Sequence, residues 1–196
     1  MRIGLVGCQR RGVAHKNAIV GSRELALGAV CDIDRNAVET MAAESKCAAF
    51  LDYGQFLESK AFDVVDIVTP QSMHHRMAMQ ALMAGYHVIV EKPLAATVEQ
   101  GEEMVRTARE RKRTLGLISQ HRFSWEMQTL KKILAENRIG HILHADVFLR
   151  FSRPPSYYTD VPSRGIGQGV LAIQSSHALD WISWLFGKTV AVYARN

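Results

Sequence analysis

A glycine turn follows the first apolar run of the chain, and its spacing is suited to dinucleotide binding. Gly7 and Gly12 hold the outer places of a G-x-G-x-x-G pattern, and Gln9 stands in the middle place. In such a turn the first glycine permits a tight bend, and the third lets the following helix pack on the strand. The middle glycine lets backbone approach a pyrophosphate, so Gln9 is compatible with binding only if its φ is negative and its side chain points away.

An acidic residue at the end of the second apolar run supports the same chemistry. Asp32 lies about twenty residues beyond the glycine turn, where a carboxylate bonds the ribose hydroxyls of the adenosine. A carboxylate there repels a 2′-phosphate, so NAD is favoured over NADP, although Arg10, Arg11 and Arg35 blur this preference. The alternative is that Asp32 merely caps the helix that starts near Asn36.

The other candidate ligands do not indicate a metal site. His74 and His75 are adjacent on a predicted helix, so their side chains diverge, and no third ligand is evident. The three cysteines, Cys8, Cys31 and Cys47, lack metal-ligand spacing. An odd number of cysteines without a signal peptide is typical of reduced thiols, and we expect a cytoplasmic protein.

Composition excludes several classes of protein. The chain has 196 residues, 47% of them hydrophobic and 22% charged, and a net charge of +5. Its densest basic stretch, 106–113, ends a predicted helix, which favours a solvated helix end over a nucleic-acid site. No apolar run approaches the ~20 residues that span a membrane. The length allows one full domain and part of another.

Short apolar runs alternate with longer amphipathic stretches over the first 119 residues. Strands are predicted at 2–7, 25–32, 64–70, 87–93 and 114–119, and helices at 11–20, 37–45, 72–84 and 97–113. This alternation predicts an α/β fold with a parallel sheet covered on both faces. Beyond residue 120 the pattern predicts a helix at 125–137, a strand at 141–151, a long loop, a helix at 170–186 and a final strand.

The stretch from Val68 to Thr97 carries the most specific spacing in the chain. It contains T-P-x-x-x-H and A-G-x-x-V-x-x-E-K-P, met by Thr69, Pro70, His74, Ala84, Gly85, Val88, Glu91, Lys92 and Pro93. Together with "CDIDRN", "QHRF" and "GVLAIQSSHALDWISWLFG", this stretch resembles the glucose–fructose oxidoreductase / inositol dehydrogenase / MocA family of NAD(P)-dependent oxidoreductases. The similarity extends over essentially all of the sequence.

The resemblance implies a fold and an assembly. It implies a Rossmann-type doubly wound parallel sheet over 1–119. An incomplete α+β domain with a mostly antiparallel sheet, for substrate binding and oligomerisation, is implied over 120–196. Family members are usually much longer, so this sequence is either a fragment or a naturally short protein. Members pair through the sheet of the second domain, and a homo-oligomer is therefore expected, with no nucleic-acid or membrane partner.

The implied activity is hydride transfer between a nicotinamide cofactor and a secondary alcohol of a sugar, cyclitol or related polyol. Lys92, preceding a cis Lys92–Pro93 bond, would stabilise the alkoxide, and His177 would act as base with Asp180 three residues on. Ile173 replaces the Asp or Asn that the family often has one turn before this His, which places turnover in question. The alternative is a non-catalytic nucleotide or sugar sensor of the same fold.

The implied contacts form two sets. The residues expected to bind the cofactor are Gly7, Gln9, Arg10, Arg11, Gly12, Asp32, Arg35, Thr69, Pro70, His74, Glu91, Lys92 and Gln120. The residues expected to bind the substrate are Lys92, Arg153, Tyr157, Tyr158, Arg164, Gln174 and His177.

Overall fold

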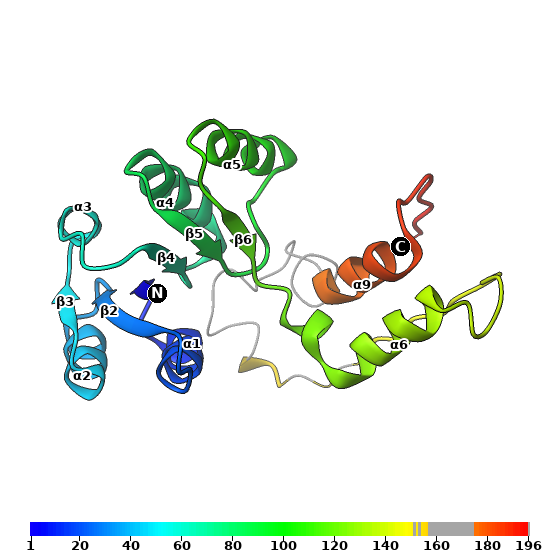
Figure 1. Ribbon diagram of the computed structural model, residues 1–196, viewed down its shortest axis with the longest axis horizontal. Coiled ribbons are helices and arrows are strands. Elements are labelled where there is room, and N and C mark those ends of the chain that lie inside the picture. The colour runs from blue at the N-terminus through cyan, green and yellow to red at the C-terminus, as the bar shows by residue number, and fades with distance from the viewer. Residues whose placement is uncertain (151, 153, 157–174, 196) are drawn as a thin grey trace. The chain divides into compact units, whose positions relative to one another are not determined.

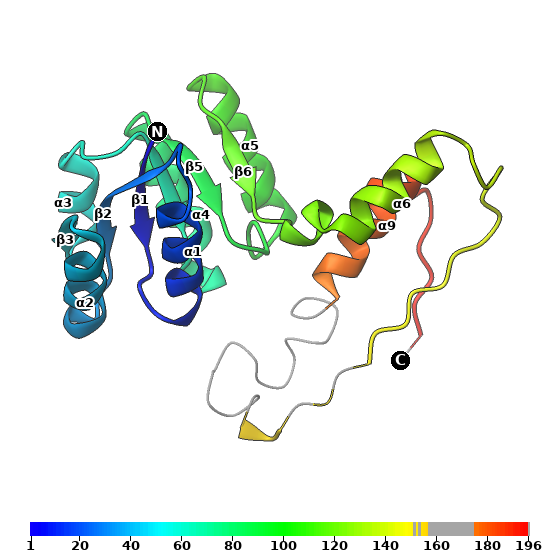
Figure 2. The same ribbon diagram turned by 60° about the horizontal axis from the view of Figure 1, so that its bottom comes forward.

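The structure, a computed structural model, describes residues 1–150, 152, 154–156 and 175–195. The chain divides into two compact units, Met1–Ile118 and Ser119–Asn196. Figures 1 and 2 show the elements of each unit, coloured from blue to red along the chain.

The first unit is built on a six-stranded sheet in which every neighbouring pair of strands is parallel. The strands are β1 (Arg2–Val6), β2 (Ala26–Cys31), β3 (Ala48–Phe50), β4 (Val64–Ile67), β5 (His87–Val90) and β6 (Leu115–Leu117). Their order in the sheet is β3-β2-β1-β4-β5-β6. The winding reverses between β1 and β4, and ligands of such sheets bind outside the carboxyl ends of the strands at this point. The predicted Rossmann-type parallel sheet is thus confirmed.

Helices cover both faces of this sheet. They are α1 (Arg10–Val20), α2 (Arg35–Ser45), α3 (Tyr53–Glu58), α4 (Gln71–Met83) and α5 (Val98–Glu110). Figure 1 shows α3, α4 and α5 on one side of the sheet and α1 and α2 on the other. Successive residues of β4 follow this division, because Val65 packs in the cluster with α4 whereas Val64 packs with Ile19 of α1. Burial on both faces explains why the strands read as continuous apolar runs.

Local sequence fixes where the helices begin and end. The side chains of Asp34, Asp52 and Thr97 accept hydrogen bonds from first-turn N–H groups of α2, α3 and α5. Gly85, at φ +91°, follows the end of α4 in a conformation that favours glycine. The predicted strands and helices of this unit are confirmed with boundaries displaced by a few residues, whereas β3 and α3 were not predicted.

The described part of the second unit consists of helices and irregular segments. It contains the 3₁₀ helix η1 (Gln120–Phe123), α6 (Trp125–Ala135) and α9 (Ser176–Phe186). No strand forms in 142–150 or 188–195, so the predicted antiparallel sheet is not confirmed. An isolated pair of strands is marginally stable in water, so extended segments of this kind form a sheet only with further strands or a helix packed against them. Throughout the described residues of both units, no helix is long and apolar enough to cross a membrane.

Candidate active site

The turn between β1 and α1 requires glycine at two of its three key places. Gly7 has φ +99°, and a Cβ there would lie 2.7 Å from the backbone oxygen of Val68. A Cβ on Gly12 would lie 1.8 Å from the backbone oxygen of Gly7. Gly7 therefore permits the bend, and Gly12 permits the close packing of the helix on the turn, as the sequence predicts.

Gln9 occupies the middle place of the turn without strain. It is the N-cap residue of α1, with φ −85°, and its side chain does not cap the helix. Instead its Nε2 donates to Oδ2 of Asp34 at 3.3 Å. The first-turn N–H groups of α1 have no acceptor within the helix and no side-chain cap, which suits a phosphate. Arg10 and Arg11 begin this helix and are exposed.

Asp32 is held by backbone groups on both of its oxygens. Oδ2 accepts from the N–H of Cys8 at 2.6 Å, and Oδ1 accepts from the N–H of Asp34 at 2.9 Å. The cap of α2 is Asp34, whose side chain accepts from Ala37, so the alternative that Asp32 caps this helix is wrong. Asp32 is only partly buried and each oxygen keeps a free lone pair, which fits a ribose diol.

Arg35 lies near this carboxylate in sequence but pairs elsewhere. Its Nη1 lies 3.0 Å from Oε1 of Glu39 in the next turn of α2, and both side chains are exposed. The residues of the turn, of the α1 N-terminus and of the β2 exit therefore fit a dinucleotide. The glycines admit the close packing, the N–H groups suit the pyrophosphate and Asp32 suits the adenosine ribose.

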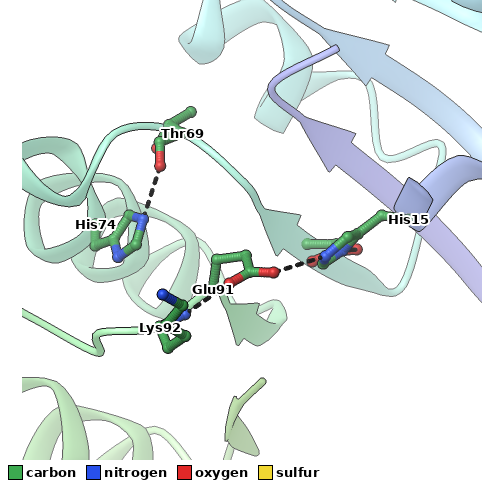
Figure 3. A network of polar contacts seen from close by, with 6 residues as sticks. His15, Thr69, His74, Glu91 and Lys92 are labelled. Atoms are coloured by element: carbon green, nitrogen blue, oxygen red, sulfur yellow. Dashed lines mark hydrogen bonds and ion pairs between the residues drawn. The ribbon is translucent and has the colours of Figure 1, made fainter. Parts of the chain in front are cut away.

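His74 connects the two loops that follow β4 and β5. It is 1% exposed, and its Nε2 lies 2.9 Å from the carbonyl oxygen of Thr69. Its Nδ1 lies 2.8 Å from the carbonyl oxygen of Pro93. Figure 3 shows the ring directed toward Thr69 from α4. Pro70 precedes α4 as its N-cap residue, so His74 fixes the exit of β4 against the turn that follows β5.

His75 makes a different contact from its neighbour. Its Nε2 lies 2.7 Å from Oε2 of Glu103 on α5, and both side chains are partly exposed. The two adjacent histidines thus have separate partners. Within the ranges that the structure describes, no group of three His, Cys, Asp or Glu side chains could hold a metal ion.

The turn after β5 carries Glu91 and Lys92 (Figure 3). Glu91 is 7% exposed, and its Oε2 accepts a hydrogen bond from the backbone N–H of Lys92 at 3.0 Å. The Lys92–Pro93 bond is cis, as the resemblance implied. Lys92 therefore lies at the carboxyl edge of the sheet, next to the strand at which the winding reverses.

Sequence reasoning missed a buried polar cluster beneath this turn. His15, on α1, lies between Asp66 of β4 and Glu91. Its Nδ1 is 2.8 Å from Oδ2 of Asp66, and its Nε2 is 3.2 Å from Oε1 of Glu91. One signal was present in the sequence. Asp66 interrupts the apolar strand "VVDIV", and a carboxylate in a buried strand requires a partner.

The cluster shifts the titration of its members. Burial by itself would lower the pKa of His15, but its hydrogen bonds to Asp66 and Glu91 and their charges raise that pKa to about 9. Burial would raise the pKa of Glu91, but the hydrogen bond from His15 and the charge of Arg11 hold it below its ordinary value. At neutral pH the cluster therefore contains an imidazolium between two carboxylates.

The thiols of Cys8 and Cys31, near the glycine turn, are unreactive at neutral pH. Burial, together with the nearby carboxylate of Asp32, raises the pKa of Cys8 and the pKa of Cys31 to about 12. Both thiols stay protonated at neutral pH, so neither is a nucleophile.

In the second unit, α9 carries His177 as its second residue. The His121 ring lies 4.4 Å from the His177 ring between centroids. Asp180, one turn further along, accepts two hydrogen bonds from the Arg122 guanidinium, one of them at 2.8 Å. This bidentate pair ties α9 to η1, in which Gln120 is the first residue and is exposed.

The remaining predicted site residues fall elsewhere in the chain. Arg153, Tyr157, Tyr158, Arg164 and Gln174, all expected to bind substrate, lie outside the described residues, as does Ile173. Lys92 belongs to the first unit and His177 to the second. The approach of these two side chains to one substrate stays a prediction.

Comparison with known proteins identifies both units. Residues 1–119 match the family described as "Oxidoreductase family, NAD-binding Rossmann fold", and residues 127–196 match its "GFO/IDH/MocA C-terminal domain". The scyllo-inositol 2-dehydrogenase (NADP(+)) IolW of Bacillus subtilis is 32% identical over 68% of this chain and 37% of its own length. The D-glucoside 3-dehydrogenase of Escherichia coli is 32% identical over 72% of this chain and 41% of its own length.

A solved dehydrogenase structure is similar to this chain in both fold and sequence. The WlbA dehydrogenase from Chromobacterium violaceum, in complex with NADH and UDP-GlcNAcA, is 32% identical with a TM-score of 0.90. The match covers 95% of this chain and 55% of that one, so the present sequence spans about half the length of such relatives. The glycine turn, the E-K-P segment and the matches over both units show that the chain belongs to the GFO/IDH/MocA oxidoreductase family, whose first domain is an NAD-binding Rossmann fold.

Proposed function

We propose that the chain takes part in NAD-dependent hydride transfer to or from a secondary alcohol of a sugar, cyclitol or related polyol. The observation that carries this proposal is the fixed turn Glu91–Pro93 at the carboxyl edge of the sheet. Buried contacts of Glu91 and His74 hold this turn in place. The names of relatives that act on an inositol and a glucoside support the substrate class.

The preference for NAD rests on the carboxylate after β2. Asp32 is oriented by the N–H groups of Cys8 and Asp34, and a fixed carboxylate there repels a 2′-phosphate. Arg35 pairs with Glu39, which reduces its capacity to offset that repulsion. One relative is named for NADP(+), whereas a similar structure contains NADH. The proposed preference for NAD therefore rests on Asp32 and Arg35 of this chain and not on its relatives.

Lys92 and His177 have separate tasks in the proposed reaction. A nicotinamide, when bound, supplies the hydride acceptor. The Lys92 ammonium would hold the substrate oxygen and stabilise the negative charge that develops on it as its proton leaves. His177 would accept that proton.

The proposed activity is tested by hydride transfer in a panel of sugars and polyols. NADH fluorescence should increase with at least one compound. Lys92→Ala and His177→Ala should each lower kcat by about 100-fold or more while leaving NAD binding nearly intact. Unchanged activity in either variant removes that residue from the mechanism. NAD binding without turnover on any compound would favour a sensor, the alternative that the dehydrogenase relatives do not support.

A further inference from the structure

The buried polar cluster beneath Lys92 joins three elements of the first unit. Asp66 lies on β4 and is 4% exposed, and Glu91 directly follows β5. The His15 side chain, 13% exposed, reaches from α1 to both carboxylates. Figure 3 shows the His15 ring directed toward Glu91 across the edge of the sheet. Nothing in the dinucleotide turn itself requires a titratable side chain at this position on α1.

The geometry requires a donor at each nitrogen of the His15 ring. Both nitrogens face carboxylate oxygens, which accept hydrogen bonds and donate none when ionised. A neutral imidazole has one N–H group, so its other nitrogen would direct a lone pair at a buried carboxylate. The imidazolium donates to both Asp66 and Glu91. Buried carboxylates without such donors are strongly destabilised.

Glu91 transmits this contact to the backbone of Lys92. Its Oε1 faces His15, and its Oε2 accepts from the Lys92 N–H. Both carboxylate oxygens are therefore engaged, which fixes the rotation of the side chain. The His74 ring bonds the carbonyl oxygen of Pro93. The backbone on the two sides of the Lys92 side chain is thus tied to the half-buried His15 of α1 and the buried His74 of α4.

We propose that His15 is a positioning residue, whose imidazolium form fixes the Glu91 carboxylate and, through it, the backbone of Lys92. The contact network stands on the geometry alone, whereas its catalytic consequence rests on the proposed function. The role of His15 is indirect, because it acts through Glu91.

The charged groups around the His15 ring determine when the network opens. Asp66 faces the ring from β4, Glu91 faces it from the turn after β5, and Arg11 lies one turn earlier on α1. The two carboxylates outweigh burial and raise the pKa of His15 to about 9. The two hydrogen bonds that His15 donates to Asp66 and Glu91 therefore persist at neutral pH. One of them is lost when the ring deprotonates, as the pH rises through about 9.

The direct test follows the His15 ring and the Lys92 amide by NMR in the ligand-free chain. The His15 ring signals, identified by their loss in His15→Gln, should keep the imidazolium pattern up to about pH 9. The Lys92 amide should change over the same pH range, because its acceptor is Glu91. In His15→Gln the Lys92 amide should lose that change. A ring that titrates near its ordinary pKa, or a Lys92 amide change that persists in His15→Gln, overturns the proposal.

Two further variants separate positioning from folding. Glu91→Gln keeps the shape of the side chain but removes its charge, so the pKa of His15 should fall and the Lys92 amide should no longer follow it. His75→Gln is the matched control, since it removes a histidine–carboxylate pair at the surface of α4. It should leave the titration of the His15 ring and the pH-dependent change of the Lys92 amide unaltered. The proposal is contradicted if, in Glu91→Gln, the His15 ring keeps its raised pKa and the Lys92 amide still changes with it.

The kinetic consequence is tested separately on the active protein. His15→Gln should lower kcat about tenfold or more with little change in the KM for NAD, because a displaced Lys92 affects the reacting oxygen. An unchanged kcat overturns the catalytic consequence. If the Lys92 amide changes together with the His15 ring but the chain binds neither NAD nor NADP, the contacts through Glu91 are supported and the proposed function is contradicted. The two failures are therefore distinguishable.

Discussion

Replacing His15 by Gln should make the stability of the chain less dependent on pH above neutrality. The pKa of His15 is about 9 in the folded protein, against 6.5 as its ordinary value. The folded state therefore binds a proton more tightly than the unfolded state does. Its stabilisation is fully present below about pH 6.5 and is lost as the pH rises through about 9.

The magnitude follows from the same two values. Their difference corresponds to about 3 kcal/mol of stability, lost at about 1.4 kcal/mol for each pH unit between them. The low exposure of the ring, 13%, means that solvent screens this interaction little. The pKa of Glu91 is held below its ordinary value, so within this range the charge change at issue is that of the His15 ring.

Urea unfolding at a series of pH values measures this loss. Between about pH 6 and about pH 10, the difference in unfolding free energy between the unaltered chain and His15→Gln should shrink by about 3 kcal/mol. Titrations common to both proteins cancel in this difference. His75→Gln, which removes a partly exposed histidine–carboxylate contact, should cost less than about 1 kcal/mol. A difference for His15→Gln that stays constant with pH would refute the reasoning.

Four further outcomes are expected. Gly12→Ala should cost about 3 kcal/mol or more in urea unfolding and abolish nucleotide binding, because the new Cβ would lie 1.8 Å from the Gly7 oxygen. Gly101→Ala, inside α5 with its nearest neighbour at 3.7 Å, should instead stabilise the chain by about 1 kcal/mol or less. Gln9→Gly should tighten NAD binding, measured by calorimetry, by about 1 kcal/mol or less, and a marked loss of affinity would mean that Gln9 itself holds the cofactor. The chain should also self-associate through the exposed apolar side chains of its second unit, and light scattering that shows a stable monomer at all concentrations contradicts this.

The features predicted from sequence are those whose cause is local. Gly7 and Gly12 were assigned correct backbone roles because a bend and a close helix contact impose their requirement on single positions. The apolar runs of β4 and β5 could be predicted because burial on both faces acts on each residue of a strand. Strand β3 was missed because its three residues form a strand only by pairing with β2.

The cluster around His15 could not be derived in the same way. His15 lies 51 residues from Asp66 and 76 residues from Glu91 in the sequence. Only the strand order, which places β1 beside β4 and β4 beside β5, brings α1 over both carboxylates. The identity of Asp66 as a charge in an apolar strand indicated that a partner exists, but not which of the chain's histidines it is.

We infer that the turn after β1 and the carboxylate after β2 form an NAD site. Calorimetric titration of the chain with NAD and with NADP tests it most directly. The structure leads us to expect that NAD binds and that NADP binds more weakly, because the Asp32 carboxylate is fixed by two backbone N–H groups. Absence of binding by both nucleotides at millimolar concentration would contradict the account.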